Sequence, residues 1–236
     1  MGLLKDKIKD LILYNRFYDY NEYRLKKFVK KISLLVEPAK KLLDVGAGES
    51  QYKNYFSYVN YISQDSRIGD VSWDYSQLDI VSEIYNIPVE DKSFDYILCT
   101  QALEHLKYPH QAFVEFSRII KNGGLLFVTC PLSWKEHQKP HDFFRYTQYA
   151  LRMLAEDSGF EVVEMNKVGG KFITITRLMI DLNLLLKIKN KPLLYLAMAI
   201  LYPLNFIIGF IGYCLDFLDK NKDLTLQYEC IFKLNY

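Results

Sequence analysis

The chain has 236 residues, of which 50% are hydrophobic and 25% are charged, and its formal net charge is +2. That length allows one domain with additions and a sizeable core, and the hydrophobic content excludes a disordered chain. A charge so near zero, without a recognition motif, excludes nucleic acid as an expected partner. The four cysteines lie far apart and form no CxxC pair, which favours buried thiols in a reducing, cytoplasmic compartment.

Residues 1–39 are predicted to form a basic helical segment. Their start, MGLLKDKIKD, lacks the apolar stretch of a signal peptide, so we expect no export. Apolar residues recur at the spacing of a helix, at Leu25, Phe28, Val29 and Ile32. This spacing predicts a helix within 3–36. Residues 1–31 hold nine Lys or Arg against four Asp or Glu, a net of +5. Such a segment either packs on the sheet edge with a solvated face or lies on an anionic membrane surface.

The stretch 41–51, KLLDVGAGESQ, reads as a buried strand that ends in a glycine turn. Asp44 follows the leucine pair of this strand, and Gly46, Ala47 and Gly48 form the turn. Glycine allows a positive φ and lets a ligand touch the main chain without an intervening Cβ. In an open parallel sheet, ligands bind at such a turn at the carboxyl end of a strand. On its own the pattern is equally compatible with a plain strand-to-helix turn.

A second strand is predicted over 58–64, which is rich in β-branched and aromatic residues and leads into Asp65. Asp65 follows Asp44 by 21 residues. Nucleotide-binding folds place an acid on the ribose hydroxyls at a spacing of about 20 residues. The two signals together favour a nucleotide-type cofactor site.

Further apolar runs predict the rest of a sheet and its helices. Strands are expected at 78–81, 94–99, 125–130, 160–168 and 224–234. One helix is expected from Pro109 to Lys121, where Gly123 and Gly124 stop it. A second is expected to run through Asp157, with Thr147 as its N-cap.

Five ordered blocks resemble the class I S-adenosylmethionine-dependent methyltransferases, of the type 11 kind. These blocks are LLDVGAGES, Asp65, 82–95, 103–106 and 118–124, and the similarity spans 40–168 and recurs at the last strand. One departure is Glu49-Ser50, where many relatives have a further glycine. The resemblance implies a three-layer, doubly wound α/β fold with seven strands, the last antiparallel. It also implies S-adenosylmethionine as the cofactor.

The resemblance further implies which residues hold the cofactor. They are Asp44, Gly46, Ala47, Gly48, Asp65, Glu83, Ile84, Thr100 and Gln101. Glu83 would accept a hydrogen bond from the adenine amino group, with Ile84 against the base. A surface acid at a strand end is the alternative reading of Glu83, and Asp79 is a less favoured occupant of its role. Thr100 and Gln101 would lie against the methionine part of the cofactor.

The segment 131–147, PLSWKEHQKPHDFFRYT, follows a strand's carboxyl end, on the substrate side of this architecture. It resembles a subgroup associated with polysaccharide biosynthesis, through His137, Pro140, Asp142 and Arg145. His137, and second His105, would position the acceptor or take its proton, because imidazole titrates near neutral pH. Arg145 would hold a phosphate or carboxylate of the acceptor. The alternative is that Asp142 and Arg145 pair to brace the loop while the histidines cap it.

A metal site is not expected in this segment. His137 and His141 are four residues apart, but Pro140 lies between them and no third ligand is evident. We therefore predict a site without a metal ion.

A long insertion, 169–223, is predicted before the last strand. Its stretch 192–215 has 24 residues without a formal charge. As a helix it would be about 36 Å long, enough to cross a bilayer core of about 30 Å. A single crossing would separate the last strand from its sheet, so we expect none. Pro203 is expected to split the stretch into two helices. These would form a lid, an apolar acceptor pocket, a homodimer face or an in-plane membrane contact through 192–218.

The sequence thus predicts a basic segment (1–39), a cofactor-binding core (40–168), an apolar helical insertion (169–223) and a final core strand (224–236). We expect an S-adenosylmethionine-dependent methyltransferase that acts on a small or lipid-linked acceptor, most simply by O-methylation of a glycan. It would act in the cytoplasm or on the inner face of the membrane. A non-catalytic cofactor-binding scaffold in a membrane assembly stays open, and so does a nicotinamide-dependent oxidoreductase, which the lack of GxGxxG disfavours.

Overall fold

The computed structural model describes residues 16–70, 72–183 and 190–235. The chain divides into two compact units. One unit holds residues 28–166 and 227–236 and contains most of the sheet. Of the described residues, the other holds 16–27, 167–183 and 190–226, so the predicted insertion shares a unit with part of the predicted N-terminal segment, whose residues 28–39 belong to the sheet unit.

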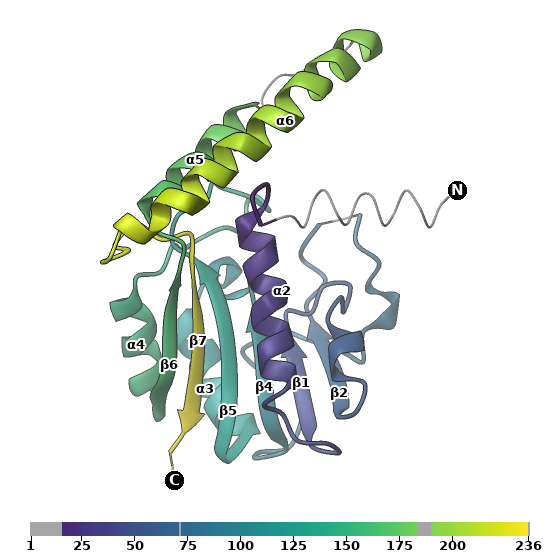
Figure 1. Cartoon of the computed structure of the whole chain (residues 1–236). Coiled ribbons are helices and arrows are strands. Elements are labelled where there is room, and N and C mark those ends of the chain that lie inside the picture. Colours follow the sequence, from purple (N-terminus) through teal and green to yellow (C-terminus); the bar gives the residue numbers. More distant parts are fainter. Residues whose placement is uncertain (1–15, 71, 184–189, 236) are drawn as a thin grey trace. The chain divides into compact units, whose positions relative to one another are not determined.

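Seven strands form one mixed sheet in the order β3-β2-β1-β4-β5-β7-β6 (Figure 1). Their bounds are β1 Lys41–Val45, β2 Asn60–Asp65, β3 Ile80–Val81, β4 Phe94–Thr100, β5 Ile120–Pro131, β6 Phe160–Val168 and β7 Gln227–Leu234. Strands β1 to β5 pair in parallel. Strand β7 runs antiparallel to β5, with Leu125 opposite Lys233 and Pro131 opposite Gln227. The seven strands and the antiparallel last strand confirm the predicted fold.

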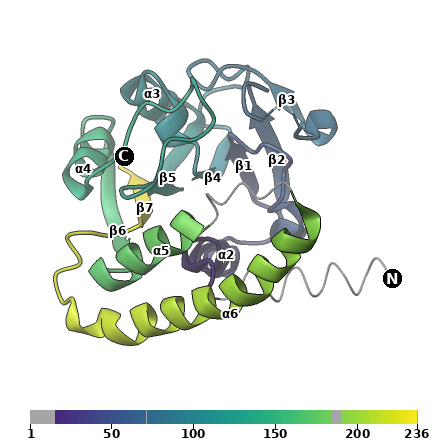
Figure 2. The same cartoon turned by 90° about the horizontal axis from the view of Figure 1, so that it is seen from above.

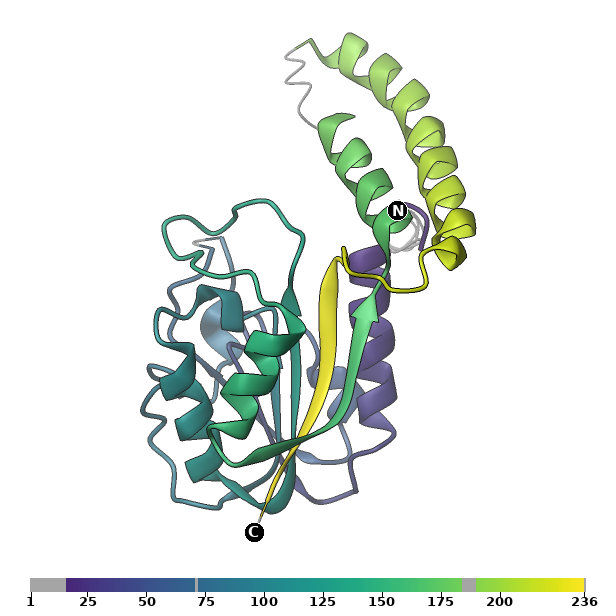
Figure 3. The same cartoon turned by 90° about the vertical axis from the view of Figure 1, so that its left-hand side faces the viewer.

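Helices cover both faces of this sheet. The α-helices are α2 Tyr20–Ser33, α3 Pro109–Ile119, α4 Gln148–Glu156, α5 Lys171–Asn183 and α6 Lys191–Leu215. Short 3-10 helices are η1 Lys53–Phe56, η2 Tyr75–Gln77, η3 Leu103–His105 and η4 Asp216–Leu218. Figures 2 and 3 show α3 and α4 on one face of the sheet and α2 on the other. The part of α2 in the sheet unit buries Phe28, Val29 and Ile32, whose helical spacing indicated this face.

The core lies between the sheet and helices α3 and α4. Phe113 of α3 contacts Phe116, Phe160 and Phe232, with ring centroids 5.8, 6.2 and 6.0 Å apart. All four rings are buried. Large aromatic side chains that interlock in this way contribute much of the hydrophobic stabilisation of a domain.

The parallel strands bring their loops to one edge of the sheet, because parallel strands end on the same side. Asp44 of β1 lies opposite Ser63 of β2 and Leu98 of β4. The residues that follow these three positions therefore meet at one carboxyl edge. Among them are Gly46 and Gln101, with Asp65 at the end of β2.

The unit that contains the insertion includes a helical hairpin. Helices α5 and α6 lie side by side and run in opposite directions (Figures 1 and 3). Gly212 of α6 faces Thr176 of α5, and a Cβ on Gly212 would lie 2.2 Å from the Thr176 Oγ1. Asp216 caps the start of α5, because its carboxylate accepts the N–H groups of Gly170 (2.8 Å) and Ile173 (3.2 Å). The hairpin is therefore closed at its base by specific contacts.

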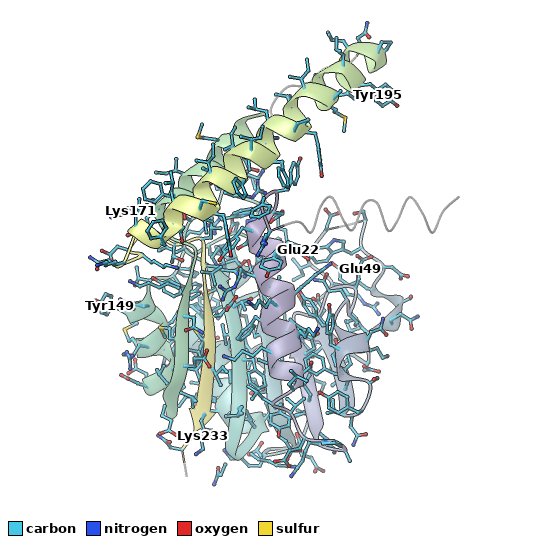
Figure 4. The ribbon with its side chains drawn as sticks, viewed as in Figure 1. Glu22, Glu49, Tyr149, Lys171, Tyr195 and Lys233 are labelled. Carbon is cyan, nitrogen blue, oxygen red and sulfur yellow. The ribbon has the colours of Figure 1, made fainter. Side chains whose placement is uncertain are left out.

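Helix α6 exposes an apolar surface (Figure 4). Within the described residues one helix is long and apolar enough to cross a membrane, Pro192–Leu218, with a mean hydropathy of 2.0. Only 11% of its most apolar stretch is buried. Four aliphatic side chains at helical spacing are each 49–62% exposed, at Leu196, Ile200, Ile207 and Ile211. Exposed apolar side chains that are contiguous in this way are uncommon on soluble monomers.

Two helix predictions differ from the structure at their ends. The helix predicted within 3–36 begins at Tyr20 and ends at Ser33; residues 16–18 form a turn, and 1–15 lie outside the described residues. Helix α3 ends at Ile119, before the glycine pair that was expected to stop it. The reason is sheet pairing: Ile120 already lies opposite Phe94 of β4, so the chain turns extended before the glycines.

The expected split at Pro203 is wrong, because α6 runs through this proline as one helix. Proline removes one N–H donor and costs about 3 kcal/mol inside a helix. Breaking the helix there would leave up to four unpaired N–H and four unpaired C=O groups at the new ends, in an apolar stretch. The one hydrogen bond lost at Pro203 costs less free energy than two new helix ends would.

Candidate functional site

A cavity of about 450 Å³ opens at the carboxyl edge of the sheet. This volume is typical of small-molecule sites, which span about 300–1,000 Å³. Five of the predicted cofactor residues line it, namely Gly46, Asp65, Glu83, Ile84 and Gln101. The structure therefore brings together residues that are up to 55 positions apart in the sequence.

The glycine turn brings the main chain against the loop after β4. Gly46 has φ +67° and Gly48 has φ +53°, a region that favours glycine. A Cβ on Gly46 would lie 2.6 Å from the Cβ of Ala102, so a residue with a side chain does not fit there without a shift. The turn thus presents bare backbone to the cavity, as the pattern predicted.

Asp65 ends β2 beside this turn and is nearly buried. Its two carboxylate oxygens accept the N–H groups of Gly48 (3.0 Å) and Arg67 (2.7 Å). Each oxygen keeps a further lone pair. The carboxylate, which lines the cavity, can therefore still accept hydrogen bonds from two adjacent hydroxyl groups.

Four predicted cofactor residues lie outside the cavity wall. Asp44 is buried and accepts a hydrogen bond from the Tyr61 hydroxyl at 2.5 Å. Burial raises the pKa of Asp44 to about 7. Ala47 and Gly48 belong to the glycine turn, and Thr100 lies at the end of β4. None of these four residues lines the cavity.

One wall of the cavity is rich in aromatic side chains. Glu83 and Ile84 line it together with Trp73, Tyr85 and Tyr108. The rings of Tyr85 and Tyr108 meet edge-on, with centroids 5.9 Å apart. The sequence analysis did not assign the three aromatic residues, because they lie in irregular segments without periodicity. Flat apolar surfaces beside one carboxylate suit a heterocyclic base.

Gln101 leaves β4 with φ +51°. Its side-chain amide donates to Thr129 Oγ1 and Gln227 Oε1, both at 3.1 Å. The side chain therefore ties the loop after β4 to β5 and β7. Its backbone N–H donates to the Thr129 carbonyl oxygen at 2.9 Å, so the groups left for a ligand are acceptors, the main-chain carbonyl and the side-chain Oε1.

Beside the cavity, Glu104 and His105 of η3 lie close to His137 from the loop after β5. The Nε2 of His105 lies 3.8 Å, and the Nε2 of His137 lies 3.9 Å, from Glu104 Oε1. The two imidazole rings meet edge-on with centroids 4.7 Å apart. The sequence analysis named both histidines but not Glu104. The sequence signal that could have identified Glu104 was its position next to His105 in the block 103–106.

Glu104 is fully buried, and neither of its carboxylate oxygens has a hydrogen-bond partner. Burial raises its pKa to about 8. Its main-chain carbonyl accepts the N–H groups of Phe143 (2.9 Å) and Phe144 (3.2 Å), which holds the loop after β5 over η3. A buried carboxyl group without a partner costs free energy, so Glu104 is a candidate functional group and does not stabilise the fold through its carboxyl oxygens.

His105 has a defined tautomer. Its Nδ1 lies 2.6 Å from the carbonyl oxygen of His141, and a carbonyl only accepts, so Nδ1 carries the proton. Its Nε2 is buried and has no hydrogen-bond partner. Burial lowers the pKa of His105, which favours the neutral ring. Of the two predicted catalytic histidines, His105 lines the cavity and His137 lies behind it.

Arg145 and Asp142 form a two-pronged ion pair, with Nη–Oδ distances of 2.7 and 2.8 Å. The other N–H groups of Arg145 donate to main-chain carbonyls, those of Trp134, Lys135 and Phe144. All five donors are thus used inside the loop, as the bracing alternative requires, and none is left for an acceptor phosphate. Hydrogen bonds from Arg145 hold the pKa of Asp142 well below its usual range. Asp142 in turn accepts the backbone N–H of His137 at 2.8 Å.

Residues 43–128 match the family described as methyltransferase domain. An uncharacterized protein of Methanocaldococcus jannaschii, MJ0638, is 34% identical over 105 residues, which cover 44% of this chain and 44% of that protein. The chain thus matches less than half the length of this curated relative.

Two solved structures share the fold with TM-scores of 0.59. The [4+2]-cyclase SpnF is 17% identical, and the match covers 90% of this chain and 81% of the cyclase. A putative sarcosine dimethylglycine methyltransferase from Galdieria sulphuraria is 14% identical, with 91% and 85% covered. At these identities the likeness shows the fold alone.

The cavity fits a nucleoside cofactor of this fold. A glycine whose Cβ would clash supplies bare backbone, Asp65 supplies acceptors for hydroxyl groups, and an aromatic wall lies beside Glu83. Residues 43–128 match the methyltransferase domain family, and the solved structures above share the fold; S-adenosylmethionine is the cofactor that this match indicates.

Proposed function

We propose that this chain transfers the methyl group of S-adenosylmethionine to a hydroxyl group of a small or lipid-linked acceptor, a glycan being the favoured class. The observation that carries the proposal is a single cavity whose wall joins the cofactor residues Gly46 and Asp65 to His105 of the buried cluster. An acceptor bound near His105 would share this cavity with the cofactor.

When bound, S-adenosylmethionine supplies an electrophilic methyl group for an in-line displacement, so alignment of the acceptor accounts for much of the rate. The acceptor hydroxyl has to lose its proton. The groups predicted to position this hydroxyl or take its proton are His105, which lines the cavity, and His137, whose ring meets that of His105 edge-on. The Asp142–Arg145 pair serves by holding the loop that carries His137.

Support for the glycan class comes from the sequence of this loop. His137, Pro140, Asp142 and Arg145 recur at this spacing in the subgroup associated with polysaccharide biosynthesis, which the segment resembles. Fold alone is a weak basis for a substrate. The acceptor class is therefore the part of the proposal that an acceptor screen has to decide.

Calorimetric titration of S-adenosylmethionine and S-adenosylhomocysteine into the full chain tests the cofactor site. We expect micromolar-range binding that Asp65→Ala weakens at least tenfold, about 1.4 kcal/mol, because two hydroxyl contacts are lost. Asp157→Ala is the matched control, since Asp157 is exposed just after α4, and it should bind as the wild type does. Absence of heat with both ligands would refute the proposed activity.

We further propose that α6 lies in the plane of an anionic membrane, which would bring a lipid-linked acceptor to the enzyme. Its 24-residue uncharged stretch supports this, and so does the exposed stripe of aliphatic side chains. A single crossing is disfavoured because β7 follows α6 in the chain and pairs with β5. Interfacial helices bind through buried apolar area.

Flotation with vesicles that contain anionic lipid tests this contact. Wild type should float with the vesicles, and the double variant Ile200→Lys, Ile207→Lys should bind at least about tenfold more weakly, because two buried isoleucines each contribute about 1.5–3 kcal/mol. Val163→Lys, at a similarly exposed apolar position of β6, should float normally. Vesicle-independent dimers that only the double variant disrupts would instead identify α6 as a homodimer face.

A further inference from the structure

We propose that Glu104, His105 and His137 bind a divalent transition-metal ion of the zinc type. The site adjoins the cavity through His105. Its role in catalysis rests on the proposed methyl transfer, whereas the binding of the ion does not. No metal was expected from the sequence, so this is a new assignment.

The geometry of the three side chains suits one ion. One ligand atom from each residue lies within 4.8 Å of the other two. The two Nε2 atoms are 3.8 and 3.9 Å from Glu104 Oε1, too far for hydrogen bonds. Ligands bound to zinc at about 2.1 Å in a tetrahedron are about 3.4 Å apart. The two distances to Glu104 Oε1 exceed this value by about half an ångström, and the ligand atoms of the two histidines lie within 4.8 Å of each other, so a modest inward movement of the side chains would let all three bind one ion.

The burial of these atoms points independently to a missing cation. Both oxygens of Glu104 and the Nε2 of His105 are buried without a hydrogen-bond partner. The Nε2 is a bare lone pair, because the proton of His105 is on Nδ1. A cation bound between the three side chains would accept lone pairs from Glu104 and from this nitrogen, and so would give these buried atoms a partner.

The outer contacts of both histidines are those of metal ligands. His105 Nδ1 donates to the carbonyl of His141 at 2.6 Å. His137 Nδ1 lies 3.4 Å from the carboxylate of Asp142, which Arg145 holds in place. Metal-bound imidazoles commonly donate their other N–H to a carbonyl or a carboxylate in this way, which fixes the ring and its tautomer. The Asp142–Arg145 brace thus orients His137 toward Glu104.

The ligand set selects the class of ion. Two imidazoles and one carboxylate suit Zn²⁺ and its transition-metal neighbours, whereas Mg²⁺ and Ca²⁺ prefer oxygen ligands alone. Three protein ligands also leave a position for a further oxygen, as in catalytic zinc sites. A hydroxyl group bound there would have a lowered pKa. In the proposed methyl transfer, the two imidazoles would then hold the ion instead of taking the proton, and the acceptor hydroxyl bound to the ion would release its proton to water.

Calorimetric titration of ZnCl₂ into the EDTA-treated, buffer-exchanged full chain tests the site. We expect one tight equivalent that Glu104→Gln and His137→Asn each weaken at least tenfold. His110→Asn removes an exposed histidine outside the cluster, and Cys214→Ser removes the one exposed thiol among the four cysteines; both should bind zinc as the wild type does. Equal affinity in wild type and Glu104→Gln, or no tight equivalent in wild type, would overturn the proposal.

Three further measurements keep the result decisive. Cobalt(II) bound by the wild type should show no thiolate charge-transfer band; such a band would place the ion at a cysteine and overturn the site even if a variant does not fold. MgCl₂ should give no comparable binding, and tight magnesium binding would overturn the zinc-type assignment. Titration of S-adenosylmethionine in the presence of EDTA measures the cofactor site without the ion. A chain that binds the cofactor but not zinc would refute only the metal site, and a chain that binds zinc but not the cofactor would refute only the cofactor site.

Discussion

Gly46→Ala is expected to weaken the binding of S-adenosylmethionine at least a hundredfold, about 2.7 kcal/mol. The new Cβ would lie 2.6 Å from the Cβ of Ala102, where carbon atoms normally approach to about 3.5–4.0 Å. The residue would also be held at φ +67°, which costs an L-residue about 1–2 kcal/mol. Both effects displace the turn or the loop after β4, and Gly46 and Ala102 both line the cavity.

Gly159→Ala is the control variant, because it introduces backbone strain at a position outside the cofactor site. Gly159 has φ +84° at the end of α4, and a Cβ there would meet only the Leu234 Cδ1 at 3.6 Å, an ordinary contact. This variant should lose about 1–2 kcal/mol of unfolding free energy in urea and bind the cofactor as the wild type does. Calorimetry on both variants measures the difference. Binding by Gly46→Ala within threefold of the wild type would mean that the turn does not touch the cofactor.

Arg145→Ala is expected to lower the free energy of unfolding by about 2–4 kcal/mol. The Asp142 side chain is only 3% exposed, and without Arg145 its remaining hydrogen bond is that from the His137 N–H. Three main-chain carbonyls of the loop after β5 lose a donor as well. The figure lies below that for a fully buried pair, because Arg145 itself is partly exposed and water can replace some of its contacts.

Arg152→Ala is the matched control for this loss. Arg152 pairs with Glu156 on the exposed face of α4, with both side chains about half exposed. Exposed pairs of this kind contribute about 0.3–0.5 kcal/mol, so urea unfolding should hardly change. Arg145→Lys should recover little, since an ammonium group cannot make a two-pronged contact with Asp142 and reach three carbonyls. Equal stability of Arg145→Ala and Arg152→Ala would show that the brace does not hold the loop.

Local sequence patterns predicted most of the sheet and the cofactor side of the cavity. The strand expected at 160–168 has those bounds in the structure, and Thr147 accepts the N–H of Ala150 as the predicted N-cap of α4. Gly46 and Asp65 line the cavity that the resemblance implied. The strand and the N-cap depend on residues that are close together in the sequence. Gly46 and Asp65 come together because parallel strands end at the same edge of the sheet.

Features that depend on distant partners were not predictable in the same way. Nothing near Arg145 shows that all five of its donors are used inside the loop, since three of the acceptors are backbone carbonyls. The sequence of the apolar run 192–215 did not show that α6 continues through Pro203. That outcome depends on a comparison of two free-energy costs, the hydrogen bond lost at the proline and the unpaired groups at two new helix ends.

The sequence by itself determined the class of this protein: a parallel sheet, a glycine turn after its first strand and an acid 21 residues beyond Asp44. Only the tertiary structure decided which histidine faces the cavity and what lies beside it. The sequence analysis considered His137 and His141 as metal ligands and predicted no metal site, whereas in the fold His137 lies beside Glu104, 33 positions away. The physical reason is that η3 and the loop after β5 meet at one edge of the sheet, where a buried carboxylate is left between two imidazoles.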